Sequence, residues 1–130
     1  MSFGIIAEIK TILESIKVLY EYTNWNTSSE IEKYPACVAD IILQEFTKQV
    51  SVGQFYDVNL RLGFYFIYEE DIEDEIFERK IDEALNRIFS ITGYNDISLQ
   101  NTTIGHFEIS GHKTKSFFAE IQFNKKGYME

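Results

Sequence analysis

Residues 57–68 have the sequence DVNLRLGFYFIY, in which two kinds of side chain alternate along the chain. One face of an extended chain carries only apolar and aromatic side chains: Val58, Leu60, Leu62, Phe64, Phe66 and Tyr68. The other face carries Asp57, Asn59, Arg61, Gly63, Tyr65 and Ile67. Such strict alternation predicts a half-buried antiparallel strand. At about 3.3 Å per residue the strand spans about 40 Å, so we expect it to be the central strand of a sheet.

Two other stretches have helical periodicity. Residues 3–16 repeat apolar side chains every three or four positions, and residues 71–91 do the same before Gly93, a natural helix stop. A helix over residues 71–91 is about 30 Å long at 1.5 Å per residue, which nearly matches the length of the expected central strand. We therefore expect this helix to lie across the sheet.

The remaining segments predict shorter strands and their connections. Residues 18–23 and 36–43 are expected as strands, with a polar connection at 24–33 and an extended, hairpin-like excursion at 44–56. Residues 97–110 predict either a strand pair or one long bent strand, and residues 116–124 a closing strand after the turn Gly111-His112-Lys113. Residues 125–130 are expected to fray.

The order of these elements is helix, three strands, helix, two strands. We predict a single α+β domain over residues 1–130, with an antiparallel or mixed sheet of about five strands and two helices packed on one face.

Composition and charge exclude several classes of protein. The 130 residues carry a net charge of −9, which disfavours binding to nucleic-acid phosphates or to an acidic membrane surface. One cysteine excludes an intramolecular disulfide and fits a reducing compartment. With no recognisable secretory signal and no apolar run of about 20 residues, we expect a soluble intracellular domain.

No pattern in the sequence indicates catalysis or a cofactor. His106, His112 and Cys37 lack metal-ligand spacing, and Cys37 lies in an apolar run without a cationic neighbour that would activate it. The acidic run at residues 69–75 matches no calcium loop and is better explained as carboxylates at the positive end of a helix. We expect no enzyme, no metal and no cofactor.

Surplus apolar side chains are the more unusual feature. Several are expected on the polar face of the central strand, in connections, or opposite the buried face of the last strand: Trp25, Phe46, Phe55, Tyr56, Tyr65, Ile67 and Phe118. They are candidates for an interface, and the alternative is that they pack beneath loops as satellite clusters. Apolar sheet faces and edges can be covered by one heterologous contact repeated until a ring closes.

The element order and several residues within it resemble the tail terminator or tail completion proteins of long-tailed bacteriophages. The matching features, in chain order, are ILESIK at 12–17, VLYEY at 18–22, a polar loop, YPACV at 34–38, the strand at 57–68, the helix with Arg79, Ile81, Leu85 and Ile88, and a closing strand pair. The resemblance implies a homo-oligomeric ring, expected to be a hexamer, in the tail or neck of a virion assembled in the host cytoplasm. Such a ring caps the tail tube and docks to the head connector, without catalysis or cofactor.

The acidity allows a more specific hypothesis and also an alternative. Carboxylates of Glu69, Glu70, Asp71, Glu73 and Asp74 in a ring lumen would repel DNA phosphates and let the genome pass without specific binding. A monomeric acidic binding or inhibitor module that blocks a basic partner site has the same composition. A small enzyme that uses a carboxylate pair is the third possibility.

Overall fold

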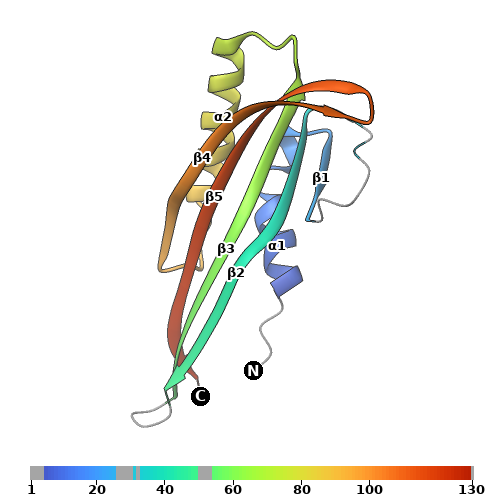
Figure 1. The fold of residues 1–130 in the computed structure, drawn as a ribbon. Coiled ribbons are helices and arrows are strands. Elements are labelled where there is room, and N and C mark those ends of the chain that lie inside the picture. The colour runs from blue at the N-terminus through green and yellow to red at the C-terminus, as the bar shows by residue number, and fades with distance from the viewer. Residues whose placement is uncertain (1–4, 26–30, 32, 50–53, 130) are drawn as a thin grey trace.

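The computed structural model describes residues 5–25, 31, 33–49 and 54–129 (Figure 1). Its elements, in chain order, are α1 (Ile5–Glu14), the 3-10 turn η1 (Lys17–Leu19), β1 (Tyr22–Asn24), β2 (Ala36–Gln49), β3 (Gln54–Glu69), α2 (Asp74–Phe89), β4 (Asp96–Ile109) and β5 (His112–Met129). The predicted α+β class and its mixed sheet are confirmed.

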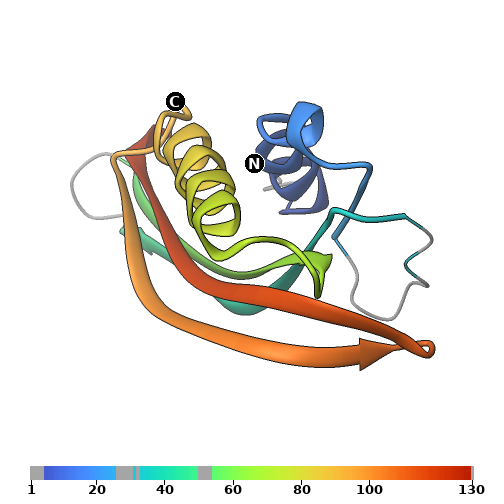
Figure 2. The same ribbon diagram turned by 90° about the horizontal axis from the view of Figure 1, so that it is seen from above.

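The strands form one five-stranded sheet in the order β1-β2-β3-β5-β4. β1 pairs with β2 in parallel, and the other neighbours are antiparallel. Both helices lie on the concave side of the curved sheet (Figure 2). β3, which contains the alternating stretch, is the middle strand, as the sequence predicts.

The core lies between the helices and the face of β3 predicted to be apolar. Every side chain of that face from Val58 to Tyr68 is buried. From Leu60 onward they pack with Ile9 and Ile12 of α1, with Ile16 just after it, and with Phe77, Ile81, Ala84 and Ile88 of α2. Each large side chain buried this way contributes about 1.5–3 kcal/mol, so burial of this face helps to hold the helix and sheet layers together.

Polar contacts attach α1 to the far end of the sheet. Glu8 accepts a hydrogen bond from the Tyr94 hydroxyl, and its other carboxylate oxygen lies 3.2 Å from the Lys125 Nζ atom. Because Tyr94 precedes β4 and Lys125 lies on β5, these contacts fix one end of the helix against the last two strands.

The prediction of a strand at residues 18–23 is wrong for its first half. Lys17–Leu19 form a 3-10 turn, and only Tyr22–Asn24 pair with β2. The chain has to turn from α1 toward the sheet edge here, and the Tyr20 side chain is buried in the core at that turn. Its Oη atom accepts a hydrogen bond of 2.7 Å from the Tyr68 hydroxyl.

The excursion predicted at residues 44–56 belongs to two long strands. Residues 44–49 of β2 pair with residues 55–60 of β3, and residues 50–53 lie outside the described residues. A β-bulge between Ile41 and Leu43 shifts the register, which obscures the alternation in the sequence.

The C-terminal strands are also longer than predicted. Residues 96–109 form one strand, β4, and β5 pairs with β3 as far as Met129, so the fraying expected for residues 125–129 is wrong. The β4–β5 hairpin turns at Ser110 and Gly111, both with positive φ angles.

Burial along one row of the sheet predicts a large loss of stability for one Leu→Ala substitution and a small loss for another. Leu62 in the centre is 0% exposed, whereas Leu99 on β4 is 44% exposed. We expect Leu62→Ala to lower the free energy of unfolding by about 2–5 kcal/mol, because it leaves a cavity. Leu99→Ala should lower it by less than about 1 kcal/mol. Urea titration of both variants checks this, and equal losses would contradict the assigned core.

Candidate functional site

The outer face of the sheet, opposite the helices, carries three zones along β3 and β5. The first is a polar ladder near residues 57–61. The Asn124 side-chain amide donates to Asp57 at 2.7 Å and to Asn59 at 2.8 Å. Beside them, the Arg61 guanidinium donates to the Gln122 side-chain oxygen at 2.7 Å. These polar groups satisfy one another, so this zone is a well-ordered polar surface.

The second zone is an apolar patch at the centre of the outer face. The rings of Tyr65 and Phe118 lie 4.8 Å apart across β3 and β5. A Cβ atom on Gly63 would come within 2.7 Å of the Phe118 ring and 3.0 Å of Ile42 Cδ1. The glycine therefore lets the Phe118 ring lie close against the backbone of β3. Tyr65 and Phe118, both predicted as interface residues, thus lie side by side.

The third zone is a small satellite cluster around Ile67, which is 4% exposed. Ile67 packs with Ala36 and Val38, and partly buried neighbours complete the cluster: Tyr22, Ile31, Tyr34, Tyr65 and Ile109. Its side chain is therefore used in packing within the chain itself. This agrees with the alternative that some surplus apolar residues pack beneath loops.

The other predicted interface residues are not brought to this patch. Trp25 packs against the core on the helix side. Tyr56 is half-buried and its ring lies where a side chain on Gly127 would be. Phe46 and Phe55 lie in paired parts of β2 and β3, and their side chains fall outside the described part of the structure.

Exposed apolar side chains gather instead on the edge strand β4 and on β2, which β1 covers only at Ala36–Val38, and the sequence analysis did not place them there. Eight large apolar side chains are exposed in the described chain, and five of them lie on β2 and β4. We call these five the edge hydrophobics: Ile41, Ile42, Leu99, Ile104 and Phe107. The run Ile41-Ile42-Leu43 is the part of the sequence that could have indicated this exposure. Side chains alternate between the two faces of a strand, so three consecutive aliphatic residues cannot all lie on its buried face.

The predicted lumen carboxylates follow the end of β3 and are partly paired. The Lys115 ammonium donates to Asp74, the His112 ring lies 2.8 Å from Glu69, and His106 lies 3.9 Å from Glu70. The hydrogen bond from Lys115 and its charge lower the pKa of Asp74. Asp71 and Glu73 are exposed and form no ion pair within the described residues. Both histidines thus pair with acidic groups at this end of the sheet.

The buried thiol and phenol groups of the core stay protonated. Burial raises the pKa of the Cys37 thiol, which favours the inert thiol form. Burial also raises the pKa of Tyr20, and that of Tyr68 to about 12, so both phenols stay protonated in their mutual hydrogen bond. Within the described residues, no group of three or more His, Cys, Asp or Glu side chains is placed to hold a metal ion.

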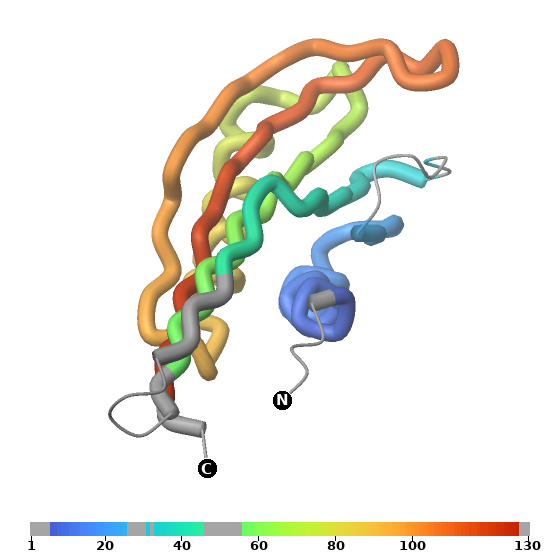
Figure 3. The backbone as a smooth tube through the Cα atoms, turned by 60° about the horizontal axis from the view of Figure 1, so that its bottom comes forward, coloured from blue at the N-terminus to red at the C-terminus, as the bar shows by residue number. Residues whose placement is uncertain are grey.

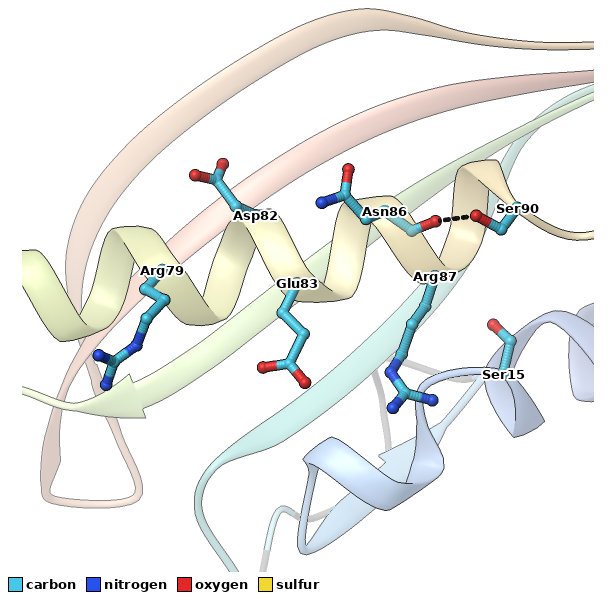
Figure 4. A pocket seen from close by; sticks show the side chains of 7 residues that line it. All are labelled: Ser15, Arg79, Asp82, Glu83, Asn86, Arg87 and Ser90. Atoms are coloured by element: carbon cyan, nitrogen blue, oxygen red, sulfur yellow. Dashed lines mark hydrogen bonds between the residues drawn. The ribbon is translucent and has the colours of Figure 1, made fainter.

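A hollow of about 750 Å³ opens between α2 and Ser15, which directly follows α1 (Figure 4). Arg79, Glu83 and Arg87 extend from one side of α2 toward the side on which Ser15, just after α1, lies. Asp82 extends in the opposite direction from Glu83, so these carboxylates do not face each other. Asp82 and Glu83 therefore do not form a facing carboxylate pair in this hollow.

Comparison with known proteins gives no family assignment: the chain matches no protein-family model and no curated protein. Among the described helices, none is both long enough and apolar enough to cross a bilayer. The resemblance to tail terminator proteins therefore stays a prediction.

The Asp74–Lys115 pair predicts a specific dependence of stability on pH. The folded-state pKa of Asp74 lies below the unfolded value of about 3.9. The pair therefore stabilises the fold above that pH, and the stabilisation is lost as the pH falls through the folded-state pKa. We expect Asp74→Asn to be less stable than the wild type at pH 7, and the difference to shrink as the pH falls below about 3.9.

A matched control separates this pair from the general effect of acids at a helix start. Glu75 also lies in the first turn of α2 but forms no ion pair within the described residues. Thermal unfolding of Glu75→Gln should therefore show a smaller difference from the wild type at pH 7. Equal pH profiles for the two variants would show that Lys115 contributes nothing.

Proposed function

We propose that this chain is a structural subunit of a bacteriophage tail, a tail terminator or completion protein that forms a ring. The ring would cap the tail tube and offer a docking surface to the head connector. The element order supports this: one helix, strands that end in the long alternating strand, a second helix and a closing strand pair. Residues 34–38 and 57–68, quoted above for the resemblance, lie at the start of β2 and within β3.

The observation that carries the proposal is the placement of the edge hydrophobics. They lie on β2 and β4, which are on opposite sides of the sheet (Figure 3). Soluble chains bury such surface when they associate, and exposed apolar side chains on a strand edge favour contact with another chain. Because the two edges differ, a contact between them is heterologous, and a heterologous contact closes into a ring when its rotation closes.

The acidic side chains fit the passage of DNA through such a ring. Glu69, Glu70, Asp71, Glu73 and Asp74 are all exposed, and the net charge of the chain is −9. A lumen lined by carboxylates repels DNA phosphates, so the genome passes without binding. The partners in this proposal are further copies of the chain, the tail tube protein and the connector.

Sedimentation of the purified chain tests the proposal. We expect a species larger than a dimer whose proportion rises with protein concentration, because each copy presents two different edges. Negative-stain electron microscopy of that species should show closed rings with a central opening.

A chain that stays monomeric at its highest soluble concentration would contradict the ring. It would favour the alternative, an acidic binding module that blocks a basic site on a partner. A two-fold dimer that grows no further would also contradict the ring, since both edges would then not be used.

A further inference from the structure

We propose that the free edge of β4 in one copy pairs with the free edge of β2 in the next copy, in antiparallel orientation. The sheet would then continue from subunit to subunit through backbone hydrogen bonds. This inference rests on the proposed self-association and specifies the surface that carries it.

Both edges are open in the described part of the chain. β4 pairs only with β5 there, and β1 covers β2 only at Ala36–Val38. The free part of β2 from Ile41 to Gln49 and the whole of β4 therefore direct every second N–H and C=O group outward. These groups are a template for a further strand.

Strand directions make the two edges compatible. β2, β3, β5 and β4 form a continuous antiparallel run, so β2 and β4 point in opposite directions. A rotation about an axis roughly along the strands keeps every strand direction. It places β2 of the next copy antiparallel to β4, which continues the alternation without a break.

Aliphatic side chains at the two edges also lie on the same side of the sheet. One row of paired residues crosses the sheet beside the bulges of β2 and β4: Ile41, Leu62, Ile121 and Leu99. The row ends in Ile41, which is 40% exposed, and Leu99, which is about equally exposed. Both neighbours in the row, Leu62 and Ile121, are fully buried, so the row lies on the helix-facing side of the sheet. Placed row on row, two copies would set the free part of β2 beside only residues 96–99 of β4, so the next copy is shifted along the strands until its Ile41 lies beside Ile104. In this register the edges bring aliphatic side chains together on the helix-facing side and remove them from water.

The β4 edge lacks the usual protection against such pairing. Residues 96–109 contain no Lys, Arg or Pro, the residues that most often block an exposed strand edge. Its acidic residues, Asp96 and Glu108, lie near the two ends of the strand. Because the complementary edge belongs to the same chain, runs in the matching direction and carries aliphatic side chains on the same side of the sheet, the occupant we assign is a second copy.

Two edge variants and a control test this pairing. Ile104→Lys places a charge on β4 at a side chain that is 58% exposed, and Ile41→Lys does so on β2. Val18→Lys makes a comparable change at a 75% exposed position on η1, away from both edges. Circular dichroism and thermal unfolding check that each variant folds, and Leu99→Lys serves as a second β4 variant.

We expect each edge variant alone to self-associate at least about tenfold more weakly than the wild type, while Val18→Lys assembles normally. A 1:1 mixture of Ile104→Lys and Ile41→Lys should form a heterodimer and nothing larger. The first variant retains an intact β2 edge and the second an intact β4 edge, so only one productive contact remains.

The outcomes separate this inference from the proposed function. Wild-type rings that both edge variants still form would overturn the edge pairing and leave the ring in place. Dimers of Ile41→Lys alone would also overturn it, since β4 would then pair with β4. A wild-type chain that never associates would overturn both proposals.

Discussion

Two helices can cover only the middle of a five-stranded sheet, and this limit determines the rest of the molecule. α1 and α2 pack on the helix-facing side chains of β3 and on their neighbours in β2 and β5. On β4, the helix-facing residues Leu99 and Ile104 stay exposed because neither helix covers them. The helix layer thus stabilises one chain by burying its central row and leaves both sheet edges unfinished.

Different parts of the surface consequently have different properties. The outer face carries three zones: a ladder of polar side chains that hydrogen-bond to one another, a patch formed by Tyr65 and Phe118, and a packed cluster around Ile67. The edges combine unpaired backbone groups with exposed aliphatic side chains. The acidic groups follow β3, where Lys115 pairs with Asp74 and the two histidines lie beside Glu69 and Glu70. Association through the edges would leave this acidic end and the outer face available for other roles.

Most of the fold could be predicted from periodicity, because the pattern was strong where burial is one-sided. The alternation at residues 57–68 identifies the middle strand, and the 3.6-residue period at 71–91 identifies α2, observed at Asp74–Phe89. The bulge after Ile41 ended the predicted strand too early, since an extra residue changes which face each side chain occupies. At residues 18–23, tertiary contacts of Tyr20 outweighed local strand preference.

The interface was harder to predict because exposure depends on what covers each face. Ile67 and Trp25 look surplus in the sequence, yet loops and helices give them neighbours. Leu99 and Ile104 look like ordinary core residues of a strand, yet no helix reaches them. The order of the strands in the sheet decides which residues a helix covers, and that order cannot be read from the sequence pattern.

Amide hydrogen exchange of the backbone, measured at low and high protein concentration, tests the central claim most directly. The outward-directed amides of β4 and of β2 beyond Ile41 have no partner strand in the described part of the single chain. We predict that alternate amides of these two strands exchange rapidly in the dilute protein and become protected together on assembly. Protection that appears elsewhere on assembly, while both edges continue to exchange rapidly, would contradict the account.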